Sequence, residues 1–113
     1  MNLLRSLVFL AVTSTVLAAE PLKAPKAGDL LGSCSVANVS CTDFDKAVGP
    51  DAKDTCLKYK LTWSDKACPT EKVVGTCVKK EGKGFGYTHS YPPGTAATAK
   101  QACTNTPGGT FIP

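Results

Sequence analysis

Hydrophobic and polar residues alternate in several short stretches of this chain, the first beginning at Val36 and the last ending at Ile112. Such alternation is typical of β-strands that bury one face. Strands are therefore predicted over residues 36–44, 59–63, 73–80, 85–91 and 110–112. The segment Glu81-Gly82-Lys83-Gly84 supplies a hairpin turn between two of them.

Two segments between these strands have short helical patterns instead. Gly49-Pro50 breaks the chain, and Asp51 suits the N-cap of a helix that continues through Leu57. A second helix is expected from an N-cap at Thr95 to Thr104, with one stripe made of Ala96, Ala99 and Cys103. Together the elements predict a small α+β domain, in which an antiparallel sheet carries two short helices.

The stretch GFGYTHSYPPGT at residues 84–95 carries a row of aromatic side chains. With a period of two, one side of this strand holds Gly, Thr and Ser, and the other side holds Phe85, Tyr87, His89 and Tyr91. We expect the second helix to pack over the aromatic side, which places Tyr87 and Tyr91 in the core. If the helix instead covers the small residues, the aromatic row is exposed and, with Trp63 nearby, forms a binding face for sugar rings or a protein.

The first twenty residues, MNLLRSLVFLAVTSTVLAAE, have the pattern of a secretory signal peptide. Arg5 supplies the positive charge, and the apolar run that follows is too short to span a bilayer. Cleavage is predicted after Ala18, so the mature chain is expected to be secreted or periplasmic, without a membrane span. It then has a flexible N-terminal arm at residues 19–32 and a single disulfide-rich domain at residues 33–113.

Six cysteines in a short exported chain predict three disulfides, because their number is even and oxidising compartments permit such bonds. They are Cys34, Cys41, Cys56, Cys68, Cys77 and Cys103. A zinc site is disfavoured, because no C-x-x-C spacing occurs and the chain has one histidine. No metal or other cofactor is therefore predicted.

Residues 33–65 and 67–113 resemble two diverged copies of one β-α-β unit. SCSVANVSCTDF matches ACPTEKVVGTCVKK, and DAKDTCLKYKLTW matches TAKQACTNTPGGTFIP. Spacing alone does not fix the disulfide pairing, but the repeat favours two equivalent bridges, Cys41–Cys56 and Cys77–Cys103. The remaining bridge, Cys34–Cys68, would then link the two copies.

Charge and side-chain chemistry exclude several classes of function. The mature chain has 12 Lys against 9 acids, a net charge of +3, and its Lys79, Lys80, Lys83 cluster lacks the interleaved aromatics of a nucleic-acid platform. His89 is the only candidate base, and no serine has the context of a hydrolytic nucleophile. Asp43 and Asp45 lack further oxygen ligands downstream and are expected to be solvated acids. We therefore expect no enzyme and no nucleic-acid partner.

The run GTC…GYTHSYPPGTAATAKQACTNTPGGTF, with an upstream ACP, resembles small cysteine-rich exported proteins of the myxobacterial type. The resemblance covers residues 67–112 well and the first half loosely. It implies an exported, disulfide-held domain, and it brings no catalytic residue with it.

The sequence thus favours a non-enzymatic, disulfide-stabilised module that binds a protein or a cell-surface glycan, or that forms part of the cell envelope. A second hypothesis is a small inhibitor of a protease or another hydrolase, which would present the loop Tyr91-Pro92-Pro93-Gly94.

Overall fold

The computed structural model describes residues 22–113. The predicted signal peptide, residues 1–18, lies outside these residues. The elements, in chain order, are β1 (Leu30–Val36), β2 (Ser40–Asp45), a 3-10 helix η1 (Lys46–Val48), α1 (Asp51–Lys58), β3 (Thr62–Ser64), β4 (Gly75–Glu81), β5 (Gly84–Ser90), α2 (Ala96–Thr104) and β6 (Thr110–Ile112).

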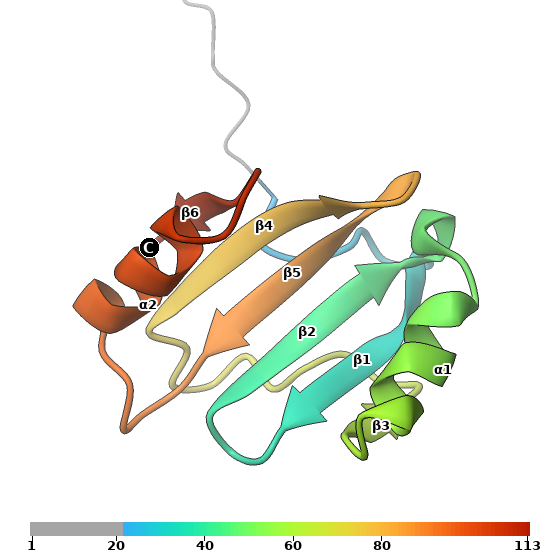
Figure 1. The fold of residues 1–113 in the computed structure, drawn as a ribbon, viewed down its shortest axis with the longest axis horizontal. Helices are drawn as coiled ribbons and strands as arrows, with labels where there is room; N and C mark the ends of the chain where they lie inside the picture. Colours follow the sequence, from blue (N-terminus) through green and yellow to red (C-terminus); the bar gives the residue numbers. More distant parts are fainter. Residues whose placement is uncertain (1–21) are drawn as a thin grey trace, which may run out of the picture.

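The strands form one six-stranded antiparallel sheet in the order β3-β1-β2-β5-β4-β6 (Figure 1). With its two helices and three disulfides, this sheet confirms the predicted disulfide-stapled α+β class. The edge strands β3 and β6 have three residues each, and short edges limit pairing with other chains.

The two halves of the sheet have the same order of elements, β-β-α-β, so the predicted β-α-β unit lacks one strand. Cys34 in β1 lies opposite Thr42 and Trp63, and Cys77 in β4 lies opposite Thr88 and Phe111. The segments Gly32-Ser33-Cys34 and Gly75-Thr76-Cys77 therefore correspond in position, whereas the sequence comparison had aligned Cys34 with Cys68. Descent of the two halves from one duplicated unit stays a prediction.

Three predicted boundaries in the first half are wrong. The segment expected to be one strand, residues 36–44, is a hairpin, because the chain turns at residues 37–39 and Val36 pairs with Ser40. The N-terminal arm predicted over residues 19–32 ends earlier, since β1 begins at Leu30. The strand expected over residues 59–63 begins only at Thr62, after a left-handed residue, Lys60, whose φ is 59°.

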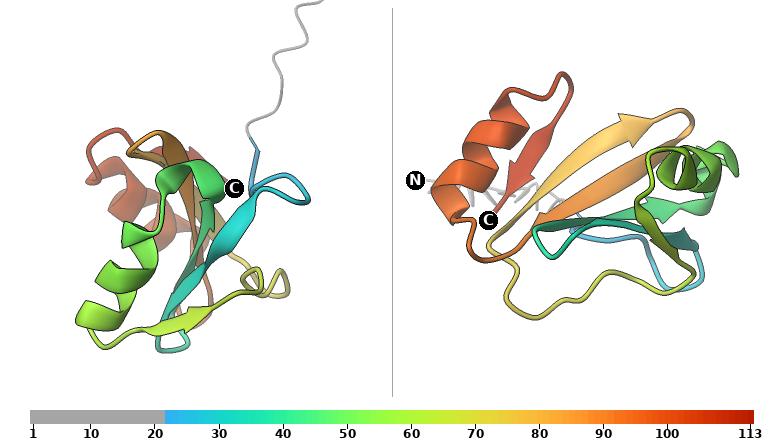
Figure 2. Two further views of the ribbon diagram at one scale, coloured as in Figure 1. Left: turned by 90° about the vertical axis from the view of Figure 1, so that its right-hand side faces the viewer. Right: turned by 60° about the horizontal axis from the view of Figure 1, so that its bottom comes forward.

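Both helices lie on one face of the sheet, at opposite ends, and leave its centre uncovered on that face (Figures 1 and 2). The helix α2 packs against β4 and β6, on the face to which Gly86, Thr88 and Ser90 of β5 point, so the expectation that it covers the aromatic side of β5 is wrong. Small side chains allow this approach: a Cβ added at Gly75 of β4 would already lie 3.4 Å from the Cβ of Ala99. We call this face of the sheet the helix face.

The opposite face of the sheet is crossed by the connection between β3 and β4, residues 65–74 (Figure 2). Ser33 in β1 anchors its start, because the Ser33 hydroxyl donates to the Lys66 carbonyl at 2.7 Å. Further along, the backbone N–H of Cys68 donates to a carboxylate oxygen of Asp43 at 2.8 Å. We call this side the loop face.

The structure forms three disulfides, Cys34–Cys56, Cys41–Cys68 and Cys77–Cys103. Only Cys77–Cys103 agrees with the predicted pairs; the predicted Cys41–Cys56 and Cys34–Cys68 are wrong. Cys41 lies opposite Ser35, so it points to the loop face, where Cys68 lies. Cys34, one residue before Ser35, points to the helix face and reaches α1.

Half-cystines supply most of the small core. Of the eight apolar side chains that are buried among residues 22–113, five are cysteines. The other three are Tyr87, Ala99 and Ile112. A domain this short buries a limited share of its surface, and bridges then provide stability that a larger aliphatic core would give.

Candidate functional site

The aromatic row of β5 points to the loop face, but it is not an open platform. Tyr87 and His89 are 5% and 7% exposed, whereas Phe85 is 43% exposed. Tyr91 follows the strand and is half-buried, with its hydroxyl donating to the Pro69 carbonyl at 2.7 Å. The connection 65–74 thus lies against His89 and Tyr91, a cover that neither sequence alternative included.

Trp63 does not belong to this row. It lies opposite Cys34, whose side chain points to the helix face, and its ring stacks on Phe44 with centroids 6.1 Å apart. The five residues proposed as one binding face therefore divide between the two sides of the sheet. The predicted face is not assembled, and Tyr91 is the member that borders a cavity beside the polar turn of β1 and β2.

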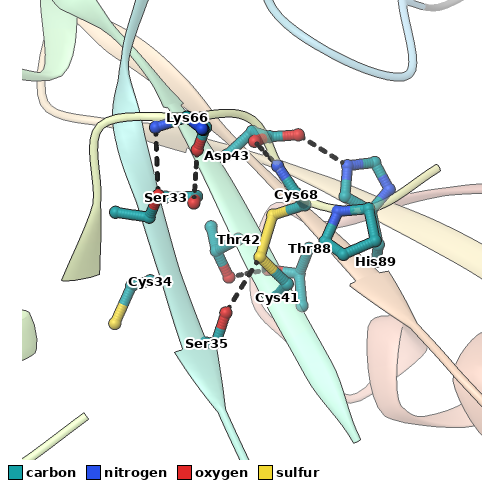
Figure 3. Close-up of a disulfide and its surroundings, with 12 residues drawn as sticks. Ser33, Cys34, Ser35, Cys41, Thr42, Asp43, Lys66, Cys68, Thr88 and His89 are labelled. Atoms are coloured by element: carbon teal, nitrogen blue, oxygen red, sulfur yellow. Dashed lines mark hydrogen bonds and ion pairs between the residues drawn. A yellow bond between two sulfur atoms is a disulfide. The ribbon is translucent and has the colours of Figure 1, made fainter. Parts of the chain in front are cut away.

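A buried polar network holds the connection 65–74 to the sheet (Figure 3). Asp43, 1% exposed, accepts the N–H of Cys68 with one carboxylate oxygen and contacts Nε2 of His89 at 2.9 Å with the other. On the far side of the ring, Nδ1 of His89 lies 2.8 Å from the hydroxyl of Thr76. The expectation that Asp43 is a solvated acid is wrong, because Cys68 and His89 use both of its oxygens.

The hydrogen-bonded series of Thr76, His89 and Asp43 has the same sequence of groups as a hydrolase triad, namely hydroxyl, imidazole and carboxylate. The resemblance ends there. Thr76 is 2% exposed and lies in β4, which is paired on both sides by β5 and β6. Backbone N–H groups within such a strand donate to the neighbouring strands. An oxyanion hole needs N–H donors that point at the substrate instead. This geometry positions a segment of chain and presents no nucleophile to a substrate.

The same network also brings together three groups that bind metals in other proteins. Donor atoms of Asp43, Cys68 and His89 all lie within 4.8 Å of one another. The sulfur of Cys68 is bonded to Cys41, however, so it cannot act as the thiolate that a metal would bind. The carboxylate and the imidazole are already engaged with protein partners, and we assign them a structural role.

A cavity of about 340 Å³ opens on the loop face at the end of the β1–β2 hairpin. We call it the Tyr91 cavity. Its lining comes from three segments of the chain: Ser35, Ala37, Asn38, Ser40 and Cys41; Pro69, Glu71 and Lys72; and Tyr91 and Pro92. Its volume lies near the lower end of the range of about 300–1,000 Å³ that is common for small-molecule sites.

The walls of the Tyr91 cavity are fixed to one another. The Cys41–Cys68 bridge joins β2 to the connection 65–74, and the N–H of Tyr91 donates to the Val39 carbonyl at 3.1 Å. Burial, and to a lesser extent the negative charge of Asp43, raises the pKa of Tyr91 above its ordinary value of 10.0. The phenol is therefore a neutral hydrogen-bond donor at physiological pH.

Four further cavities involve residues discussed above, among them one of about 390 Å³ beside Phe85 and Tyr87. One, of about 330 Å³, lies over Asp43, Thr76 and His89 and is bordered by Lys23 of the N-terminal arm. Another, of about 210 Å³, lies on the helix face over Thr42 and Thr88, whose hydroxyls are 2.8 Å apart. In the cavity over His89, the polar groups already bind one another, and in the cavity on the helix face Thr42 bonds to Thr88 and Lys79 lies 3.9 Å from Glu81. In the Tyr91 cavity, the side chains of Asn38, Glu71 and Lys72 have no such partner among the described residues.

Sequence reasoning missed the polar lining of the Tyr91 cavity. Asn38, Glu71 and Lys72 lie in turns and in an irregular connection, where no periodicity marks them. Asn38 also begins a formal glycosylation sequon, Asn38-Val39-Ser40, but that pattern does not indicate a ligand cavity. The disulfide pairing is the feature that could have revealed these lining residues. A bridge between Cys41 and Cys68 places residues 69–72 beside the β1–β2 hairpin.

Comparison with protein-family models, with curated proteins and with solved structures gives no match for this chain. The resemblance to myxobacterial exported proteins therefore rests on the quoted motifs alone and stays a prediction. Among residues 22–113, no helix has the length and apolar character needed to cross a membrane. The three disulfides are compatible with an extracellular or periplasmic protein.

Proposed function

We propose that this chain is an exported, non-enzymatic binding module that contacts cell-envelope material through the Tyr91 cavity. The observation that carries this proposal is the cavity itself, which is walled by three segments and braced by the Cys41–Cys68 bridge. Among the described residues, no hydrogen bond or ion pair within the protein engages the side chains of Asn38, Glu71 or Lys72. These exposed groups are available to a ligand.

Export is supported by the signal-peptide pattern and by the disulfides, which persist in oxidising compartments. We propose that the signal peptide is cleaved after Ala18. An intact mass of the exported protein, alkylated without reduction, tests both points. The expected mass lacks residues 1–18 and carries no alkyl group, whereas alkylation at two or more cysteines would contradict the closed scaffold.

The absence of catalysis is also part of the proposal. It is supported by the burial of Thr76, His89 and Asp43, whose polar atoms hold the connection 65–74 and leave no exposed nucleophile beside the imidazole. Screening the protein against ester, peptide and glycoside substrates provides the check. Turnover that disappears in a folded His89→Gln variant would overturn this part of the proposal.

Cosedimentation with insoluble cell-envelope fractions tests binding directly. The oxidised protein is expected to pellet with the envelope material, and the double variant Asn38→Ala, Glu71→Ala to remain in the supernatant. Tyr59→Ala is the matched control, because Tyr59 is 66% exposed beside α1 and does not line the Tyr91 cavity. Equal pelleting of the double variant, or no pelleting of the wild type, would show that the proposal is wrong.

The second candidate function is inhibition of a protease or another hydrolase. It is favoured by the loop Tyr91–Gly94, in which Pro92 and Pro93 are exposed and the N–H of Gly94 donates to the Tyr91 carbonyl at 3.0 Å. A rigid exposed loop loses little entropy on binding. A panel of secreted proteases and glycosidases, titrated at equimolar protein, distinguishes the two functions, since an inhibitor abolishes activity stoichiometrically and an envelope-binding module does not.

A further inference from the structure

We infer that the Tyr91 cavity takes an uncharged saccharide, with the sugar ring against Tyr91 and its hydroxyls against the polar turn and the connection 65–74. This inference deepens the proposed function and rests on it. It follows from the charge balance, hydrogen-bonding capacity and rigidity of the cavity.

The charges around the cavity favour an uncharged ligand. Its lining contains one carboxylate, Glu71, and one ammonium, Lys72, so the formal charges of the wall cancel. A phosphate or a sulfated polymer would need an excess of basic groups, and a cationic ligand would need an excess of acids. Neither excess is present among the residues that line the cavity.

The uncharged polar groups suit a polyhydroxylated ligand. The amide of Asn38 both donates and accepts, and so do the hydroxyls of Ser35 and Ser40. Sugar hydroxyls also donate and accept, so each of them can form a hydrogen bond with any of these side chains. Ser35 donates weakly to the sulfur of Cys41 at 3.3 Å, which leaves its oxygen free to accept.

Tyr91 supplies the apolar surface that such a ligand also needs. Its hydroxyl is engaged by the Pro69 carbonyl, so the ring is held in one orientation and offers carbon atoms to the cavity. Aromatic rings have a negative face that attracts the polarised C–H groups of a sugar ring. Of the aromatic binding face that was the alternative in the sequence analysis, one ring thus remains, placed beside hydrogen-bonding groups.

The cavity is organised before any ligand binds. Three non-glycine residues among those described have left-handed backbone, and two of them, Ala37 with φ of 45° and Lys72 with φ of 62°, line this cavity. Such residues are held in place by their surroundings and concentrate at functional sites. Because the walls are already fixed by a disulfide and by backbone hydrogen bonds, binding has little ordering cost.

The test is a titration of the oxidised, isotope-labelled protein with uncharged oligosaccharides, namely cellopentaose, xylopentaose, mannopentaose and chitopentaose, followed by amide chemical shifts. We expect at least one sugar to shift amides of residues 35–41, 70–72 and 91 selectively. Tyr91→Ala and Asn38→Ala are each expected to weaken binding at least tenfold, whereas Tyr59→Ala leaves it unchanged. Asn38 is exposed in a turn, so its variant keeps the test valid if Tyr91→Ala fails to fold.

Salt and competition separate this inference from the proposed function. Binding of an uncharged sugar is expected to be unchanged between low and high salt, because screening weakens only charged contacts. If envelope binding depends on Asn38 but no oligosaccharide competes with it, the saccharide inference is wrong and the binding module stands. Shifts caused only by a proline-rich peptide or by an anionic polymer would equally overturn the saccharide inference. If no envelope fraction binds and no sugar shifts the cavity amides, both proposals are wrong.

Discussion

Both carboxylate oxygens of Asp43 are used inside the protein, one by the N–H of Cys68 and the other by Nε2 of His89. A buried donor left without its acceptor typically costs about 1–3 kcal/mol, and removing the Asp43 carboxylate leaves two such partners, the Cys68 N–H and the His89 ring, so the total is about 2–6 kcal/mol. We therefore expect Asp43→Ala to lower the free energy of unfolding by about that amount, as measured by denaturant titration with the disulfides intact.

Asp43→Asn is the informative companion variant. Its amide can still accept from Cys68 and can donate to His89 if the imidazole changes tautomer, so a smaller loss is expected. Asp51→Ala, at an exposed site in the first turn of α1, is the control and should cost less than about 1 kcal/mol. A loss as small for Asp43→Ala would show that the network does not hold the connection 65–74.

Two tyrosines on the loop face make stability depend on alkaline pH. Burial, with smaller contributions from Asp45 and Asp43 respectively, raises the pKa of Tyr87 and of Tyr91 above 10.0. Above pH 10 the unfolded chain loses phenolic protons that the folded chain retains, so stability is fully present below that pH and falls as the pH rises through the folded pKa. The measurement is the denaturant midpoint against pH, with the double variant Tyr87→Phe, Tyr91→Phe expected to lose much of this dependence. An unchanged pH profile in that variant would assign the effect to other groups.

At the scale of elements, the sequence predicted the cap of α2 but not that of α1, where the N-cap position is Pro50 and Asp51 is the first helical residue. Thr95 is the N-cap of α2 and forms a reciprocal capping box with Thr98, as its position before an alanine-rich stretch indicated. The side of β5 that α2 covers depended on register instead. Glu81 pairs with Gly84 across the turn, which sets Cys77 opposite Thr88 and fixes the bridge to Cys103 on the helix face. The turn at Glu81-Gly82-Lys83-Gly84 predicts this register, whereas strand periodicity alone does not say which side of β5 faces α2.

The capping box gives a direct test of α2. In Thr95→Ala the N–H of Thr98 loses its side-chain acceptor, a contact of 3.2 Å, and the expected loss of stability is about 1 kcal/mol. Thr104→Ala is the matched control, because its hydroxyl only bonds back to the Lys100 carbonyl within the helix. Thermal unfolding of both variants provides the comparison. If both lose the same stability, the capping box does not stabilise α2.

For the molecule as a whole, the three disulfides close loops of similar length but join different elements. The separations are 22, 27 and 26 residues, so each bridge is expected to contribute about 3.5 kcal/mol in the chain-entropy model. Replacing Cys41 and Cys68 together by Ala frees one wall of the Tyr91 cavity and should abolish envelope binding in the folded fraction. Replacing Cys34 and Cys56 should cost similar stability but retain binding, and loss of binding in both variants would refute this division of roles.

The pairing itself follows from the two faces of the sheet, and it can be checked without any variant. Cys34 and Cys41 lie on opposite faces, so Cys34 can reach only α1 and Cys41 only the connection 65–74. Trypsin leaves both cysteines in one peptide, residues 27–46, joined to peptides 54–58 and 67–72. The three linked peptides have the same mass under the predicted Cys41–Cys56 pairing. Fragmentation of peptide 27–46 between Val36 and Val39 is therefore needed to tell the two pairings apart. We expect peptide 54–58 to stay with the Cys34 fragment; its retention on the Cys41 fragment would mean that the two faces are assigned wrongly.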